Sequence, residues 1–202
     1  MLKRIAYSLL VASLGVGSIF GWNLTARAGY ESADYEVIES DGKFEIREYP
    51  DLMLASTRSG KNAQGRDGSF MKLFRYISGA NESQRKISMT TPVFMENGMP
   101  DADVQMGFVM PKQVAEDGVP TPSCQDVNIR IRKGGRFAVI RFSGVLNNQL
   151  AKENEVKLRA WITDKEYSVN DSSDLNVVES AAYDPPFTPG PLRRNEVLIR
   201  LQ

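Results

Sequence analysis

Residues 44–60 read FEIREYPDLMLASTRSG, and residues 127–144 read VNIRIRKGGRFAVIRFSG. In both stretches apolar and polar residues alternate on either side of a short turn signal, a pattern typical of a β-hairpin. The first turn falls at Tyr49-Pro50-Asp51, and the second falls at Gly134-Gly135. The sequence therefore predicts the same hairpin twice, once in each half of the chain.

A predicted helix follows each hairpin. The first helix has one apolar stripe at helical spacing, formed by Phe70, Leu73, Phe74 and Ile77. Asp67 or Ser69 is its candidate N-cap. The second helix is expected over about 149–163, with Asn147 or Asn148 as its N-cap. Its apolar side is supplied by Leu150, Leu158, Trp161 and Ile162.

Two further strands are predicted after each helix. They cover 86–95 and 104–110 in the first half, and 177–183 and 196–201 in the second. The chain then reads as a repeated ββαββ unit, joined by residues 117–125. Short connections favour antiparallel or mixed pairing. The expected fold is α+β, a distorted eight-stranded barrel flanked by two helices.

Residues 1–28 have the features of an export signal. Two basic residues precede an uncharged run over 5–21, and Ala26-Arg27-Ala28 matches the small-x-small pattern that signal peptidase reads. We therefore expect a signal peptide at 1–28 and a periplasmic or secreted domain over 29–202. The alternative is an uncleaved membrane anchor, because the apolar run approaches the ~20 residues that span a bilayer.

The chain contains no histidine and only one cysteine, Cys124. Histidine is the usual general base and transition-metal ligand near neutral pH, so Ser/His/Asp hydrolases, Cys/His hydrolases and Cys/His zinc sites are excluded. Residues 60–65 have the glycine spacing of a phosphate loop. The motif fails at Arg66-Asp67, where it requires Lys followed by Ser or Thr.

The charge balance gives no reason to expect a nucleic-acid partner. Removal of residues 1–28 takes away Lys3, Arg4 and Arg27 and no acid, which leaves 22 basic and 25 acidic residues and a net charge of −3. A domain with this charge has no global attraction for a polyanion.

Two segments have an unusual composition. Residues 87–95, ISMTTPVFM, read as a strand interrupted by Pro92, which must lie at an edge, a bulge or a break. Five methionines gather over 89–110, where they suit either core filling or a flat apolar ligand. Residues 183–196, YDPPFTPGPLRRNE, read as a rigid loop. Its Arg193-Arg194 can fork onto a carboxylate, either from a ligand or from Asp184 or Glu196.

These segments closely resemble the signature sequences of the SOUL haem-binding family. The similar stretches are KISMTTPV at 86–93 and AYDPPFTPGPLRRNEV at 182–197, together with YEVIE at 35–39 and FEIREY at 44–49. The resemblance runs from about Tyr35 to the C-terminus. It implies a distorted eight-stranded barrel built from a duplicated ββαββ unit, which is the plan that the periodicity also predicts.

The resemblance further implies non-covalent binding of haem or another tetrapyrrole in an apolar surface groove along the first helix. Carried over position by position, the groove uses Phe70, Phe74 and Arg75, with Phe187 and Thr188 of the proline-rich loop opposite. Aromatic rings can stack on a macrocycle, and a guanidinium can pair with a propionate. The same stripe is also what an amphipathic helix needs to pack on a sheet, so Phe70 and Phe74 can equally belong to the core.

This sequence departs from the family pattern at the axial ligand of the haem iron. Some members use a histidine as axial ligand, and this chain has none. Tyr76, Met71 and Cys124 are the formal candidates for that role. The other possibility is burial of the macrocycle without any axial ligand, and no metal-ligating residue is predicted.

The expected function is therefore an exported, monomeric carrier or buffer of haem or a related tetrapyrrole, and not an enzyme. A second interpretation is a sensor or interaction domain for flat apolar molecules, because the duplicated plan also resembles the effector-binding domains of bacterial multidrug-responsive regulators. No DNA-binding helix pair accompanies it. A third interpretation is a tetrapyrrole-processing enzyme, for which spacing alone positions no acid or base.

Overall fold

The computed structural model describes residues 29–59, 68–97, 104–169 and 178–202. The predicted signal peptide at 1–28 and the glycine-rich stretch at 60–65 lie outside these residues. Within them, no helix combines the length and apolarity needed to cross a bilayer.

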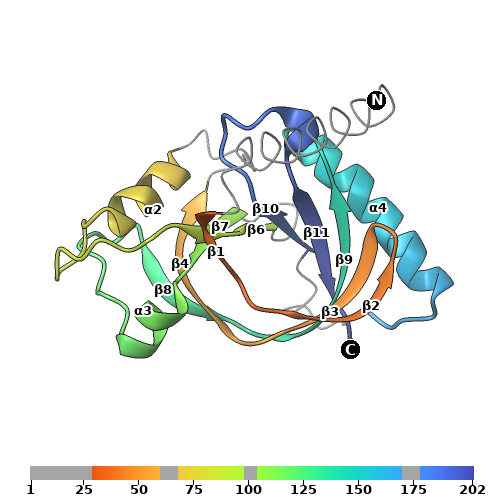
Figure 1. Cartoon of the computed structure of the whole chain (residues 1–202), viewed down its shortest axis with the longest axis horizontal. Coiled ribbons are helices and arrows are strands. Elements are labelled where there is room, and N and C mark those ends of the chain that lie inside the picture. The colour runs from red at the N-terminus through yellow and green to blue at the C-terminus, as the bar shows by residue number, and fades with distance from the viewer. Residues whose placement is uncertain (1–28, 60–67, 98–103, 170–177) are drawn as a thin grey trace, which may run out of the picture.

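One curled antiparallel sheet organises the molecule (Figure 1). Its order is β2-β3-β9-β11-β10-β6-β7-β4-β8, and every neighbouring pair is antiparallel. The strands are β2 (Glu36–Asp41), β3 (Phe44–Tyr49), β4 (Leu52–Ser59), β6 (Val93–Asn97), β7 (Val104–Val109), β8 (Asn128–Arg132), β9 (Gly135–Phe142), β10 (Val178–Ala182) and β11 (Asn195–Arg200). The described sheet thus has nine strands and two free edges, an open half-barrel in place of the expected eight-stranded barrel.

The two predicted hairpins are wrong, although their strands lie where the sequence places them. Strand β3 pairs with β9, and β4 pairs with β8. The register is continuous through both pairs, from Phe44 opposite Ile140 to Ser56 opposite Asn128. The supposed turns are therefore the bend of one long two-stranded ribbon, which passes from one side of the curl to the other (Figure 1).

The bend is held by contacts between its two strands. The Asp51 carboxylate accepts hydrogen bonds from the backbone N–H of Gly134 at 2.7 Å and from Lys133 Nζ at 3.0 Å, and these two bonds lower the pKa of Asp51. A Cβ atom on Gly134 would lie only 2.3 Å from the carbonyl oxygen of Tyr49. Glycine is needed at position 134 because the two backbones approach so closely.

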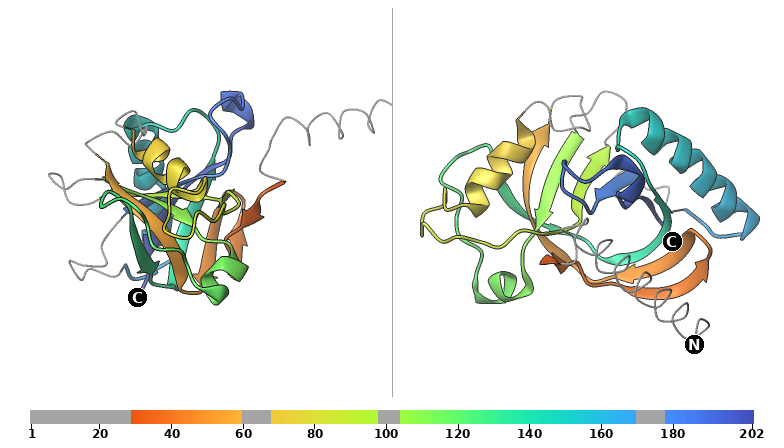
Figure 2. Two further views of the ribbon diagram at one scale, coloured as in Figure 1. Left: turned by 90° about the vertical axis from the view of Figure 1, so that its left-hand side faces the viewer. Right: turned by 45° about the horizontal axis from the view of Figure 1, so that its top comes forward.

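Two of the three described α-helices pack on the outer side of the curl (Figure 2). Helix α2 (Ser69–Ile77) packs on β4 and β7, and α4 (Asn148–Asp164) packs on β9 and β11. In α4 the predicted apolar residues Leu158, Trp161 and Ile162 are buried. The third helix, α3 (Lys112–Asp117), begins the connection between the halves and was not expected.

The helix starts differ in how well they were predicted. Asn147 caps α4, where its Oδ1 accepts the Leu150 N–H at 2.8 Å, as predicted. Gly68 is the N-cap of α2, with φ at 88° and no side-chain cap. The predicted Ser69 cap is therefore wrong, and Asp67 lies outside the described residues.

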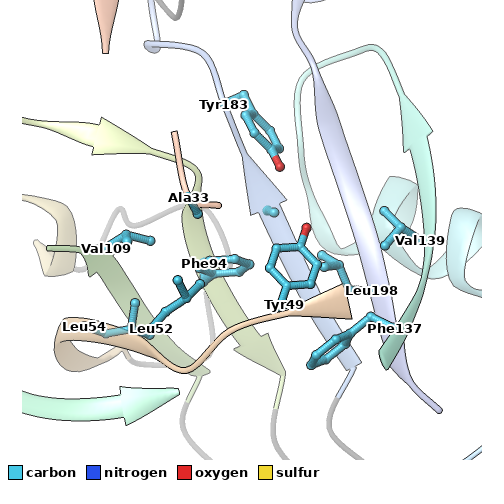
Figure 3. Close-up of a cluster of buried hydrophobic side chains, with 11 residues drawn as sticks. Ala33, Tyr49, Leu52, Leu54, Phe94, Val109, Phe137, Val139, Tyr183 and Leu198 are labelled. Atoms are coloured by element: carbon cyan, nitrogen blue, oxygen red, sulfur yellow. The ribbon is translucent and has the colours of Figure 1, made fainter. Parts of the chain in front are cut away.

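Both faces of the curled sheet are buried. Along β9, Ala138 and Ile140 face outward to the α4 cluster, while Phe137 and Val139 face inward. The inner core is drawn in Figure 3 and consists of Ala33, Tyr49, Leu52, Leu54, Phe94, Val109, Phe137, Val139, Ala181, Tyr183 and Leu198. Side chains at alternate positions of β9 therefore serve two separate cores.

The segment around Pro92 joins the main sheet to a second, two-stranded sheet. Strand β5 (Thr90–Thr91) pairs in parallel with β1 (Glu31–Ser32), and β6 begins after Pro92. The predicted break at Pro92 is confirmed. The predicted start of this strand at residue 86 is wrong, because residues 86–89 are not in a strand.

Candidate functional site

Helix α2 divides its predicted apolar stripe between the core and the surface. Leu73 and Ile77 are buried, whereas the Phe74 side chain is 43 % exposed. Phe70 is half-buried at the boundary, where its ring stacks on Phe74 at 6.1 Å between centroids and meets Phe108 edge-on at 5.2 Å. The sequence alone left Phe70 and Phe74 open between core and ligand, and the structure places Phe74 at the surface.

Met71 and Arg75 share the exposed side of the helix with Phe74. Met71 is 48 % exposed, and Arg75 is exposed in the last turn. Spacings of three and four residues place these side chains next to one another on a helix. We call Met71, Phe74 and Arg75, with Phe70 at their buried edge, the outer face of α2. It offers a ring, a thioether and a guanidinium.

The three formal candidates for an iron ligand lie in different environments. Tyr76 is buried, and its hydroxyl donates to the Pro120 carbonyl at 2.7 Å. Burial raises the pKa of Tyr76 to about 12, which disfavours the phenolate that a metal would need. Cys124 is exposed in the loop after α3. Only Met71 lies on the outer face of α2.

Several hydrogen bonds hold the proline-rich loop between β10 and β11. Arg193 donates through Nε to the Thr188 carbonyl at 2.7 Å and through Nη2 to the Pro186 carbonyl. The loop includes a short 3-10 helix, η2 (Gly190–Leu192), whose Gly190 carbonyl accepts the Gly144 N–H at 2.9 Å. These bonds fix the loop against the end of β9.

The loop presents its two predicted site residues in opposite ways. The Phe187 side chain is 78 % exposed, and Thr188 is 2 % exposed, with its hydroxyl buried and without a partner in the described structure. Figure 1 shows the loop and α2 on the same side of the molecule. Among the described residues, no hydrogen bond or ring contact joins Phe70, Phe74 or Arg75 to Phe187 or Thr188.

Arg194 pairs inside the fold, which is one of the two outcomes that the sequence left open. Its Nε and Nη2 donate to Glu196 Oε1 at 2.9 and 2.6 Å, and its guanidinium lies 4.1 Å from the centre of the Tyr183 ring. Asp184 accepts the Arg194 backbone N–H at 2.6 Å. The predicted pairing with a carboxylate is therefore confirmed for Arg194, with Glu196 as the carboxylate, whereas Arg193 donates to backbone carbonyls.

Glu196 is the centre of a buried ionic network, of which the sequence indicated only the pair with Arg194. Arg47 holds it with two parallel bonds, from Nη1 at 2.7 Å and from Nη2 at 2.9 Å, and Arg47 Nε donates to Glu45 at 2.7 Å. Arg47 and Glu196 are both fully buried. Burial alone would raise the pKa of Glu196, but the hydrogen bonds and charges of Arg47 and Arg194 outweigh it and lower that pKa.

Two tyrosines complete this network. The Tyr183 hydroxyl donates to Glu196 Oε2 at 2.9 Å, and the Tyr49 hydroxyl accepts from Arg47 at 3.0 Å. Figure 3 shows the two phenol groups pointing toward one another. Burial raises the pKa of Tyr49 to about 12, and burial together with the Glu196 charge raises the pKa of Tyr183 well above its ordinary value. Both phenols therefore remain protonated donors and acceptors near neutral pH.

A second buried pair joins β8 to β10 on the inner side of the sheet. Arg132 donates to Glu179 from Nε at 3.0 Å and from Nη2 at 2.5 Å. The Arg132 guanidinium also lies 4.4 Å from the centre of the Phe137 ring and 4.5 Å from that of Phe94. Burial raises the pKa of Glu179, and Arg132 opposes that shift. The inner face of the half-barrel thus contains charged pairs among its aromatic rings.

The chain is similar to two curated haem-binding proteins. It is 29 % identical over 168 residues to heme-binding protein 1 of Xenopus laevis, with 79 % of this chain and 84 % of that protein covered. It is 28 % identical over 162 residues to heme-binding protein 2 of Mus musculus, with 77 % of each chain covered.

Solved structures of low sequence identity share the fold. The EcmrR C-terminal domain matches with a TM-score of 0.57 and 12 % identity, covering 83 % of this chain and 98 % of that domain. A hydrolase from Listeria innocua matches with a TM-score of 0.58 and 8 % identity, covering 82 % of this chain and 94 % of that chain. At such identities the likeness concerns the architecture alone.

The family model described as SOUL heme-binding protein matches residues 30–200, which include the curled sheet, α2 and the proline-rich loop. The two curated relatives agree with that match over most of their length. This chain therefore belongs to the SOUL haem-binding protein family.

Proposed function

We propose that this protein binds haem or a related tetrapyrrole reversibly, as an exported carrier or buffer that works as a monomer and without catalysis. Membership of a haem-binding family supports the ligand class. The observation that carries the proposal is the exposed Phe74 ring on α2, at a position where the family resemblance expects a macrocycle contact. Export rests on the sequence of residues 1–28.

The outer face of α2 fits a tetrapyrrole by its chemistry. The Phe74 ring would stack on the macrocycle, Phe70 would extend the apolar surface at its buried edge, and Arg75 would pair with a propionate. Phe187, held out from the fixed loop, supplies a second exposed ring. Haem, when bound, would supply a redox-active iron, and the protein would bury one face of the macrocycle.

Phe74→Ala should weaken tetrapyrrole binding about tenfold or more and change stability by less than about 1 kcal/mol, because the ring is partly in water before the ligand arrives. Arg75→Ala should also weaken binding while leaving stability almost unchanged, since an exposed charge contributes little to folding. Porphyrin titrations and thermal melts on the same samples measure both quantities.

A matched control is Val156→Ala, which removes an exposed apolar side chain from α4. It should change neither binding nor stability. Normal binding by both Phe74→Ala and Arg75→Ala would place the tetrapyrrole site elsewhere. A Phe74→Ala melt several degrees below that of Val156→Ala would assign this ring to the core.

Metal-free protoporphyrin should bind within about tenfold of haem, a difference of ~1.4 kcal/mol. The chain has no histidine, and burial of the macrocycle at roughly 25 cal/mol per Å² can exceed a weak axial bond. Parallel titrations with the two ligands and with a flat non-porphyrin dye test this. A much larger preference for haem would indicate an axial ligand, and loss of that preference in Met71→Leu would identify it. Equal affinity for the dye would favour the sensor interpretation.

We also infer that the fold contains a duplicated ββαββ unit. The first unit would be β3, β4, α2, β6 and β7, and the second β8, β9, α4, β10 and β11. The strand order supports this, because strands that correspond in the two units lie at equal distances from the β10–β6 pair in the sheet. The first strand of each unit pairs with the second strand of the other.

A further inference from the structure

A surface hollow lies apart from the outer face of α2. It is formed by the β2–β3 turn, the end of β9 and the segment that contains η2, and its volume is about 620 Å³. Its lining residues are Gly42, Lys43, Arg141, Phe142, Ser143, Pro191, Leu192, Arg193 and Arg194. Four of the nine are basic and none is acidic. The volume falls within the range of small-molecule sites.

Two of these basic residues already have carboxylate partners. Arg141 pairs with the buried Glu45, and Arg194 pairs with Glu196 at 2.6 Å. Each of these carboxylates is also shared with Arg47. Three guanidinium groups therefore share these two carboxylates, and the Asp184 carboxylate lies against the Arg194 backbone.

The other two basic residues add charge that no carboxylate balances in the described part of the chain. Arg193 donates to the Pro186 and Thr188 carbonyls, which are neutral acceptors. Lys43 has a ring contact with Phe44 at 5.4 Å, and no ion pair is shown for Lys43 or Arg193 among the described residues. Like charges gathered in a concave surface raise the local concentration of anions.

The rest of the wall is apolar. Phe142 is half-buried and packs against the α4 cluster, and Leu192 is 42 % exposed beside Pro191. The hydrogen bonds that fix the proline-rich loop also fix this wall relative to β9. A ligand with a charged group and a small apolar body would contact both kinds of surface at once.

We propose that this hollow binds a small organic anion, with a carboxylate or phosphate group among Lys43, Arg141 and Arg193 and an apolar body against Phe142 and Leu192. The site is separate from the outer face of α2, with which it shares no lining residue. The proposal does not rest on the tetrapyrrole function, although Arg193 also holds the loop that carries Phe187.

The test is a titration of the purified protein with benzyl phosphate and with phenylacetate, followed through amide NMR shifts at low salt. Saturable shifts are expected around Lys43, Ser143 and Arg193, at dissociation constants near or below about 1 mM. Inorganic phosphate should bind about tenfold more weakly than benzyl phosphate, since it lacks the apolar body. Benzylamine should not bind. Whichever of benzyl phosphate and phenylacetate binds more tightly identifies the preferred charged group.

Variants assign the binding to these residues. Lys43→Gln should weaken benzyl phosphate binding about threefold, and Lys43→Arg should restore it. Lys157→Gln removes the same charge from the exposed side of α4 and should have no effect. Leu192→Ser should reduce the preference for benzyl phosphate over inorganic phosphate.

Several results would overturn the proposal. They are the absence of saturation by either organic anion, equal binding of inorganic phosphate and benzyl phosphate, and equal losses in Lys43→Gln and Lys157→Gln. Prebound protoporphyrin should leave benzyl phosphate binding unchanged. Competition between them would make the hollow part of the tetrapyrrole site and would refute its independence. If the protein bound no tetrapyrrole, the expected binding of benzyl phosphate in the hollow would be unchanged.

Discussion

Glu196→Gln should lower the free energy of unfolding by about 3–5 kcal/mol, because removal of one partner from a buried ion pair leaves the other charge uncompensated. Arg47 and Arg194 both donate to this carboxylate, and Arg47 is fully buried. Glutamine keeps the shape of the side chain, so the loss reports the charge and its hydrogen bonds. The melting temperature should fall by about 10 °C or more.

Glu48→Gln is the matched control. Glu48 lies 3.7 Å from Arg136, both side chains are about half exposed, and such a pair contributes about 1 kcal/mol or less.

The pH dependence of stability gives a second check on Glu196. The pKa of Glu196 is lowered in the folded protein from its ordinary value of 4.5, so its stabilisation is complete at neutral pH and is lost as the pH falls through the folded pKa. The gap between parent and variant should therefore narrow in acid, and a gap that stays constant down to pH ~2 would contradict the assignment.

Most helices and strands could be predicted from the sequence because their signals are local. The stripe of α2, the Asn147 cap of α4 and the alternation in β3 and β9 each lie within a few residues of the element that they define. Strand pairing is different. Tyr49-Pro50-Asp51 and Gly134-Gly135 read as turns within separate hairpins. In the structure the two stretches face one another across the ribbon, and both bend at the point where they meet. That contact is separated by more than eighty residues in the chain.

The buried ionic network could not be predicted for a related reason. Alternation such as Ile46-Arg47 or Ile131-Arg132 normally means one buried and one solvated face. In this curled sheet the arginines of these strands point to the inner face, where Arg47 and Arg132 are buried. The curl depends on the whole strand order, which local sequence does not specify. A buried arginine on an alternating strand is recognisable only once its Glu196 or Glu179 partner is in place.

The candidate site was predictable in its residues but not in their roles. The apolar residues Phe70, Leu73, Phe74 and Ile77 follow a single helical period. Only some of them are buried against the sheet. Which side chains remain in water depends on how far α2 is rotated against β4 and β7. The same holds for Phe187 and Thr188, which are neighbours in the sequence and opposite in exposure. The composition predicted a rigid loop and gave no signal for its orientation.

Gly134→Ala should destabilise the fold by about 3 kcal/mol or more, because the added Cβ has no space. It would lie 2.3 Å from the Tyr49 carbonyl oxygen, 2.5 Å from the Pro50 carbonyl carbon and 2.8 Å from the Asp51 nitrogen. All three are backbone atoms, so no side-chain rotation relieves the overlap, and the two ribbon strands must separate where they bend. Overpacking usually costs about 1–3 kcal/mol when side chains can adjust. Because no side chain can adjust here, we expect a loss of about 3 kcal/mol or more.

The control for this substitution is Gly190→Ala in η2, where the added Cβ meets Val145 at an ordinary 3.4 Å and the expected change is within about 1 kcal/mol. Chemical denaturation of the two variants and the parent measures the difference. If the two predicted hairpins were real, Gly134 would be a turn residue without close backbone contacts from Tyr49 and Pro50, and alanine there would cost only about 1 kcal/mol. A Gly134→Ala chain as stable as Gly190→Ala would therefore contradict the continuous ribbon, whereas a large and selective loss is what close contact between Tyr49-Pro50 and Gly134 requires.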